Sequence, residues 1–216
     1  MKRNIAIVLA GCGVYDGAEI HEATLTMLAI ARKGAVYHLF APDIDQTHVI
    51  NHYTGKEMPE SRNVLVESAR IARGKIKPLC ELDISNFDAI VFPGGFGVAK
   101  NLCSLAFDGP DCTVDSEVER VVLSAVEKGK PIGALCIAPA MMAKILGDVK
   151  VTIGQEEGTI QAIEAMGGKH SLTDHGQIVI DEKHKLVTTP CYMLDATIDQ
   201  IADGVENLID AVFDLI

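Results

Sequence analysis

Short apolar runs alternate with amphipathic stretches along the chain. Four runs, at residues 4–10, 35–41, 87–92 and 132–135, contain almost no polar alternation. All four are predicted strands, and those at 4–10 and 132–135 are typical of strands buried in a parallel sheet. Further strands are predicted at 149–153, 177–180 and 185–189, the last two forming a hairpin around 181–184, and a shorter extended piece at 76–82.

Helices are predicted where apolar residues recur at helical spacing between these strands. They cover residues 18–33, 62–73, 113–128, 156–166 and 196–216, with a short helical piece at 99–105. Thr113 is the predicted N-cap of the helix that ends at Lys128, and Gly34 is the predicted C-cap of the first helix. Residues 44–62 read as a loop or small hairpin.

Alternation of strands and helices predicts one α/β domain over residues 1–216, with a mostly parallel sheet covered on both faces. No linker or repeat interrupts it. In such sheets, ligand sites form beyond the carboxyl ends of the strands. Three loops fall there: 11–17, 93–97 and 136–137. We therefore expect the functional site among them, with Gly13, Asp16 and Gly94 lining a pocket.

Composition and charge exclude several classes of protein. The 216 residues carry a net charge of −11 without a basic cluster, which disfavours nucleic-acid binding. The first apolar run is too short for a signal peptide or a membrane span, and no other stretch is long enough. The six cysteines include no CxxC pair and no ligand spacing for zinc, so we expect reduced thiols in the cytosol and no metal. His48 and His52 read as solvated loop residues rather than ligands.

Cys136 lies at a predicted corner between strand and helix. The apolar run 132–135 precedes it, and a run of Ala and Met with Pro139 in its first turn follows it. The N–H groups and macrodipole at a helix start lower the pKa of a nearby thiol, so a nucleophilic thiolate is expected. The alternative is a small buried apolar residue that ends a strand.

The other two loops offer partners for this thiol. Gly94 and Gly95 allow close backbone approach, and their N–H groups with that of Ile137 could form an oxyanion hole; the alternative is an ordinary turn. Glu19 or Glu22 could shuttle protons, unless both only face solvent. A nucleotide site is not expected, because Asp16 stands where a third glycine of the dinucleotide fingerprint would be.

Several motifs together resemble a known superfamily. Residues 92–102 (FPGGFGVAKNL), the corner at 133–139 (GALCIAP) and the helix carrying Glu22 are similar to ThiJ/PfpI proteins, which are related to class I glutamine amidotransferases. More narrowly, residues 10–22, 40–43, 111–115 and 187–190 resemble the ElbB group, called isoprenoid biosynthesis proteins with an amidotransferase-like domain. The resemblance covers nearly the whole chain.

This resemblance implies a flavodoxin-like three-layer sandwich and a homodimer. It also implies a nucleophilic Cys136 paired with Glu22, and an oxyanion hole made by Gly95 and Ile137. Similar proteins are glyoxalases that need neither glutathione nor a cofactor, and they convert glyoxal, or methylglyoxal, to the 2-hydroxy acid. The expected partners are therefore a small aldehyde and a second copy of the chain, with no nucleic acid and no membrane.

One departure from the superfamily pattern bears on activity. Ile137 follows the cysteine where related peptidases have a histidine, and His170, His175 and His184 cannot be tied to the site. Glutaminase or protease activity through a Cys–His–acid triad is therefore disfavoured. A redox sensor that uses the same cysteine is the main alternative. No Asp-rich motif points to a prenyl diphosphate.

Overall fold

A seven-stranded sheet forms the centre of the computed structural model, which describes residues 2–216. The strand order is β10-β11-β7-β6-β1-β2-β5, and every neighbouring pair is parallel except β10 and β11. The strands are β1 (Asn4–Val8), β2 (Val36–Ala41), β5 (Ile76–Pro78), β6 (Ala89–Phe92), β7 (Ile132–Leu135), β10 (Val179–Asp181) and β11 (Leu186–Thr189). The predicted mostly parallel sheet is confirmed, and so is the hairpin that ends it.

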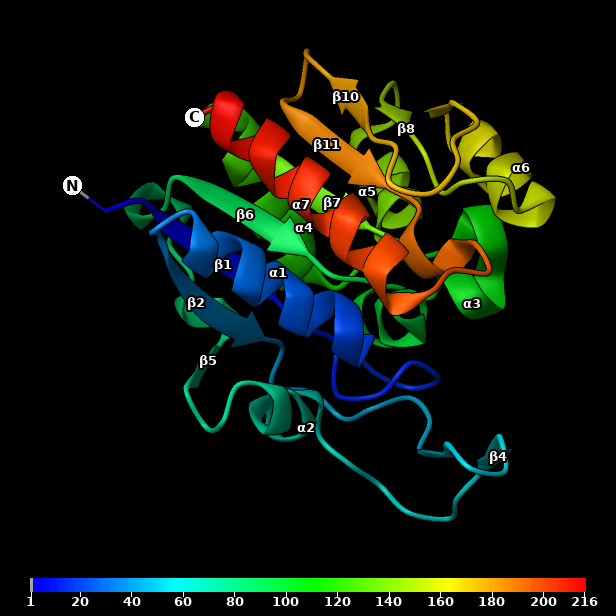
Figure 1. Cartoon of the computed structure of the whole chain (residues 1–216). Coiled ribbons are helices and arrows are strands. Elements are labelled where there is room, and N and C mark those ends of the chain that lie inside the picture. The colour runs from blue at the N-terminus through cyan, green and yellow to red at the C-terminus, as the bar shows by residue number, and fades with distance from the viewer. Residues whose placement is uncertain (1) are drawn as a thin grey trace.

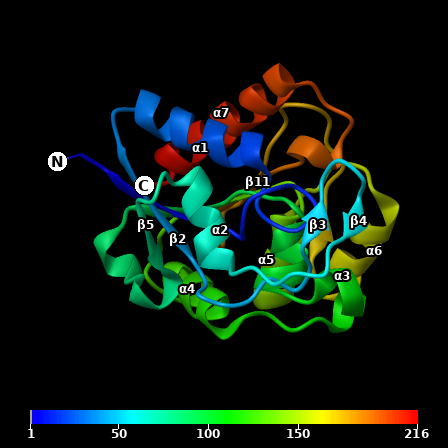
Figure 2. The ribbon, with the colours of Figure 1, turned by 90° about the horizontal axis from the view of Figure 1, so that it is seen from below.

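Helices cover both faces of this sheet (Figures 1 and 2). They are α1 (Ile20–Arg32), α2 (Val64–Ile71), α3 (Leu105–Asp108), α4 (Ser116–Glu127), α5 (Ala138–Leu146), α6 (Glu157–Ala165) and α7 (Ile198–Asp214). Helices α1 and α7 lie side by side on one face, and α4 and α5 lie on the other. Alternate residues of β1 enter the two cores: Ile5 and Ile7 pack with α1 and α7, whereas Ala6 and Val8 pack with α4 and α5. The fold is thus the expected flavodoxin-like sandwich.

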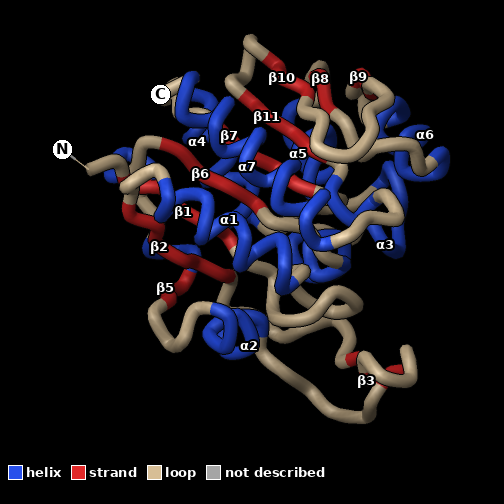
Figure 3. Tube along the Cα trace, viewed as in Figure 1, coloured by secondary structure: helices blue, strands red, loops and turns tan. Residues whose placement is uncertain are grey.

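Two short strand pairs flank the main sheet (Figure 3). Strands β3 (Ile50–Asn51) and β4 (Lys56–Glu57) form an antiparallel pair within the segment expected to be a loop or small hairpin. Strands β8 (Lys150–Val151) and β9 (Lys169–His170) form a parallel pair, of which β9 was not predicted. No helix within residues 2–216 combines the length and apolar character that crossing a bilayer requires.

One predicted helix cap is wrong. Asp115, not Thr113, caps α4, and its Oδ1 accepts the N–H groups of Glu117 and Val118 at 3.0 and 3.1 Å. Thr113 instead pairs with Ser104: its carbonyl accepts the Ser104 N–H and its own N–H reaches the Ser104 hydroxyl. The difference arises because the pairing with Ser104 keeps Thr113 outside the helix, so that the helix begins only after Asp115.

The loops after β1 and β6 interlock at the carboxyl ends of the strands. The N–H of Glu19 donates to the Gly94 carbonyl at 2.9 Å, and the N–H of Gly97 donates to the Gly17 carbonyl at 2.9 Å. Gly95 has φ +99°, and a Cβ there would lie 2.4 Å from both Glu19 N and Gly17 O. Only glycine fits this crossing, which fixes the start of α1 against the loop after β6.

Candidate active site

Cys136 forms a strained corner between β7 and α5. Its φ is +59°, a region that costs a non-glycine residue about 1–2 kcal/mol. Its own N–H donates to the Thr189 carbonyl of β11 at 3.0 Å, and Pro139 stands in the first turn of α5, as the sequence predicts. The side chain is buried, with 7% of the residue exposed. The sheet therefore holds the sulfur at the edge where the three loops meet.

Glu22 supplies the carboxyl group that faces this sulfur. The residue is fully buried in the first turn of α1, and Glu19 caps that helix by accepting the Glu22 N–H at 2.7 Å. The two carboxyl oxygens of Glu22 accept the N–H of Gly94 at 2.8 Å and that of Tyr192 at 3.3 Å. Of the two candidate acids, Glu22 thus reaches the thiol and Glu19 serves the helix.

Gly94 separates the carboxyl group from the thiol by the width of a backbone. A Cβ on Gly94 would lie 2.7 Å from Glu22 Oε2, 2.9 Å from Cys136 Sγ and 2.3 Å from Cys136 Cβ. Both functional atoms therefore lie within 3 Å of one point, and each group shifts the pKa of the other. The backbone N–H groups of Gly95 and Ile137 act on the same sulfur and lower its pKa. The structure brings together all four residues that the sequence assigned to catalysis and the oxyanion hole.

Burial sets the protonation of this pair. It raises the pKa of Glu22 to about 8, and the nearby Glu19 carboxylate adds to this rise, against the opposing N–H bonds from Tyr192 and Gly94. Burial, and then the Glu22 charge, also raises the pKa of the Cys136 thiol well above 9, although the N–H groups of Gly95 and Ile137 oppose this. The expected lowering of the thiol pKa by the helix start is therefore wrong. At neutral pH the pair holds both protons, and the first leaves near pH 8.

A cavity of about 430 Å³ opens onto the sulfur. Its wall is mostly apolar, with Glu156, Thr159 and Tyr192 as its polar residues. The lining residues are Val14, Gly95, Phe96, Cys136, Ile137, Glu156, Thr159, Tyr192 and Met193. Cys136 is therefore reachable by a small molecule in spite of its burial.

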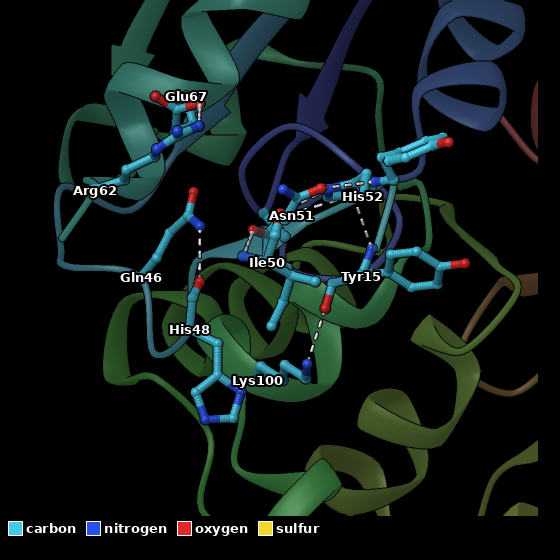
Figure 4. Close-up of polar contacts among 12 residues, drawn as sticks. Tyr15, Gln46, His48, Ile50, Asn51, His52, Arg62, Glu67 and Lys100 are labelled. Atoms are coloured by element: carbon cyan, nitrogen blue, oxygen red, sulfur yellow. Dashed lines mark hydrogen bonds and ion pairs between the residues drawn. The ribbon is translucent and has the colours of Figure 1, made fainter. Parts of the chain in front are cut away.

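Gly13, Asp16 and Gly94 are not among the residues that line this cavity, which corrects their expected place in the pocket. Gly94 packs between Cys136 and Glu22, whereas Gly13 and Asp16 contact the segment 44–63. A Cβ on Gly13 would meet the His52 ring at 2.4 Å, and Asp16 Oδ2 accepts the Ile50 N–H at 2.6 Å. The same contact region includes the Tyr15 N–H, which donates to His52 Nε2, and Lys100, which donates to the Tyr15 carbonyl (Figure 4). Gly13 and Asp16 thus anchor the segment 44–63 on the first loop. These two residues hold the first loop in place through that segment and do not line the cavity.

Tyr192 and Glu156 are site residues that the sequence did not single out. Tyr192 follows β11 in a 3-10 turn (Cys191–Met193), and its hydroxyl contacts His21 Nδ1 at 2.8 Å. Glu156 caps α6 by accepting the N–H groups of Gly158 and Thr159. Capping was the only local signal for Glu156. For Tyr192 none existed, because its contact with Glu22 spans 170 positions.

The remaining histidines have partners away from the sulfur. His170 Nε2 accepts the Ile153 N–H at 3.1 Å, His184 pairs with Asp181 at 3.0 Å, and His175 lies 3.8 Å from Asp174. Within residues 2–216, no three His, Cys, Asp or Glu side chains are grouped as a metal ion would require.

The amino-acid sequence of this chain is similar to that of a named human protein. The chain is 49% identical over 221 aligned positions to the Homo sapiens protein named glutamine amidotransferase-like class 1 domain-containing protein 3, mitochondrial; this covers 98% of the chain and 82% of that protein. No protein-family model matches it.

Two solved structures superpose on nearly the whole chain. The isoprenoid biosynthesis protein with amidotransferase-like domain from Ehrlichia chaffeensis superposes with a TM-score of 0.93 at 36% identity, covering 99% of both chains. Glyoxalase III from Candida albicans superposes with a TM-score of 0.63 at 15% identity over 97% of both chains, which shows a shared fold.

Proposed function

Because this chain belongs to the glutamine amidotransferase-like class 1 family, within the ThiJ/PfpI/DJ-1 superfamily, we propose that it converts glyoxal, and methylglyoxal, to the 2-hydroxy acid without glutathione or a cofactor. The observation that carries the proposal is the buried pair of Cys136 and Glu22, with two N–H groups on the sulfur. A carboxyl group whose pKa is about 8 is suited to give and take protons near neutral pH.

The first step is addition of the Cys136 sulfur to the aldehyde carbon. In the fraction of molecules in which Glu22 is ionised, which grows as the pH approaches 8, the thiol proton passes to the Glu22 carboxylate as the carbon–sulfur bond forms. The carbonyl oxygen gains the negative charge, and the N–H groups of Gly95 and Ile137 are near enough to the sulfur to stabilise it. Glu22 then returns the proton to this oxygen, which yields a hemithioacetal.

The second step moves one hydrogen between neighbouring carbons. Glu22 removes the proton from the carbon bonded to sulfur and passes it to the oxygen of the adjacent carbon, which gives an enediol. Glu22 then takes the proton of the hydroxyl group on the sulfur-bound carbon and delivers it to the adjacent carbon. The product on the protein is a thioester that carries a hydroxymethyl group. Water hydrolyses this thioester to glycolate and frees the thiol, so the net change is glyoxal plus water to glycolic acid, with no external oxidant or reductant.

The charges around the cavity favour an aldehyde over glutamine. None of the described residues that line it is Lys, Arg or His, whereas Glu156 and the nearby Glu19 and Glu22 are acidic. The carboxylate of glutamine would lack a cationic partner there, and burying an unpaired charge is costly. The acid produced from an aldehyde meets the same environment, which favours its release.

The test is glycolate formation from glyoxal, followed by chromatography of the product. We expect Cys136→Ala to abolish turnover and Glu22→Gln to lower it by at least roughly a hundredfold, the usual range for removing a proton shuttle. Cys80→Ala serves as control, because Cys80 is an exposed free cysteine. Full activity in either site variant would refute the proposal, as would glutamine hydrolysis in place of aldehyde turnover.

A redox-sensing role is the second candidate, and one observation favours it. Glu22 is protonated at neutral pH and contacts the thiol, so it could donate a hydrogen bond to an oxidised Cys136. Mass spectrometry after mild peroxide treatment separates the two functions: selective oxidation at Cys136 without aldehyde turnover supports the sensor. Uniform oxidation of all six cysteines counts against it.

We also propose a homodimer in a compartment that keeps thiols reduced. The six cysteines are free, in agreement with such a compartment. The name of the Homo sapiens relative adds "mitochondrial", so the cytosol and the mitochondrial matrix are both candidates. Light scattering of the purified chain tests the dimer, and imaging of a tagged chain tests the compartment.

A further inference from the structure

The cavity above Cys136 is much larger than glyoxal requires. It encloses about 430 Å³, whereas one water molecule occupies roughly 30 Å³ in the liquid and a four-atom dialdehyde only a few times that. Cavities of this size hold ligands that carry a substantial apolar part. Most of the space beyond the reacting carbon would remain unfilled with glyoxal bound.

Apolar side chains from four segments surround that space. Val14 comes from the first loop, Phe96 from the second, Ile137 from the cysteine corner and Met193 from the turn after β11, and the ring of Tyr192 completes the wall. Phe96 is 49% exposed, so its ring is available to pack against a ligand in the cavity. Covering such a ring with an apolar group removes both surfaces from water, which stabilises the complex.

The ionised carboxyl group of Glu156 in the cavity wall disfavours binding of anions. Glu156 accepts the N–H groups of Gly158 and Thr159, and these bonds lower the pKa of its carboxyl group, so it stays ionised. Glu19 is a second buried acidic residue, beside Glu22. A ligand carboxylate in this space would meet like charges and no cation among the described lining residues.

Resting on the function proposed above, we infer that this site takes an uncharged 2-oxoaldehyde whose second carbonyl carries an apolar substituent, such as an aryl or branched alkyl group. The cavity volume, its apolar wall and its acidic rim point to this class together. Glyoxal is then a minimal substrate that uses only the part of the site next to the sulfur.

Alkylation of Cys136 tests the class of ligand without requiring turnover. Three reagents share one leaving group: iodoacetamide, N-benzyl iodoacetamide and iodoacetate. Rates at Cys136, read by peptide mass spectrometry, are divided by the rates at the same cysteine in the urea-unfolded chain. We expect the benzyl reagent to gain about tenfold over iodoacetamide, and iodoacetate to lose about tenfold. Equal ratios for all three reagents would overturn the inference.

A matched pair of variants locates the effect. Phe96 and Phe107 are both 49% exposed, but only Phe96 lines this cavity. Phe96→Ser should remove most of the benzyl preference, and Phe107→Ser should retain it. Equal losses in the two variants would refute a role for the cavity wall.

Turnover separates this inference from the proposed function. We expect phenylglyoxal to have a higher kcat/KM than glyoxal by about tenfold, mainly through KM. Turnover of glyoxal with no gain for phenylglyoxal would overturn the inference and leave the proposed function intact. A benzyl preference in alkylation with no turnover of any aldehyde would overturn the proposed function and support the ligand class.

Discussion

Replacing Glu22 by glutamine changes how the stability of the protein depends on pH. The carboxyl group is fully buried, and its pKa rises from 4.5 to about 8 on folding. Between these two values the unfolded chain releases the proton and the folded chain keeps it. The free energy of unfolding therefore falls as pH rises, by roughly 5 kcal/mol in total, since each pKa unit corresponds to about 1.4 kcal/mol.

The side-chain amide of the Glu22→Gln variant stays neutral, so the variant lacks this slope. An amide has only one acceptor oxygen, whereas the N–H groups of Gly94 and Tyr192 face both carboxyl oxygens of the natural residue. Leaving one of these N–H groups unpaired costs about 1–3 kcal/mol at every pH. We expect the variant to be less stable than the natural protein at pH 5 and more stable than it at pH 9.

Urea unfolding from pH 5 to pH 9, followed by circular dichroism, measures this crossover. Glu57→Gln is the charge-matched control, because Glu57 is exposed and its replacement should leave the slope unchanged. Parallel pH curves for the natural protein and Glu22→Gln would show that the carboxyl group does not keep its proton on folding. That result would remove the physical basis of its assigned role.

The same contacts support three further predictions. Gly94→Ala should abolish turnover, because its methyl group would lie 2.3 Å from Cys136 Cβ and displace the thiol from Glu22; unchanged turnover would contradict this packing. Alkylation of Cys136 by iodoacetamide should still be slow at pH 8 and speed up above pH 9, because burial and the Glu22 charge raise the pKa of the thiol well above 9; a rate already constant at pH 8 would contradict it. Asp115→Ala should cost about 1 kcal/mol of unfolding free energy by removing a helix cap, and Thr113→Ala less; the reverse order in urea unfolding would restore Thr113 as the cap.

Local sequence was sufficient for most of the fold. Strands β1, β6 and β7 were predicted because strands buried on both faces need continuous apolar runs, which stand out from the amphipathic helices. Strand β2 was predicted from a similar run, although its first three residues, 36–38, are exposed. The corner at Cys136 was visible for a related reason, since a strand signal stops there and a helix signal starts. Strand β9, with only Lys169 and His170, carries no such signal, because pairing with β8 alone defines it.

The sequence by itself singled out Cys136, Glu22, Gly95 and Ile137, through the three loops at strand ends and the resemblance of their motifs, but it missed Tyr192 and Glu156. Only the tertiary structure decided their chemistry. The pKa of Glu22 and that of Cys136 depend on removal from water and on groups 72 and 170 positions away from Glu22 in the chain, so no local pattern encodes them. The same reason explains why the helix start did not lower the thiol pKa. The helix dipole lowers the pKa of a thiol only within about one turn, and burial of Cys136 by the surrounding segments raises this pKa by more.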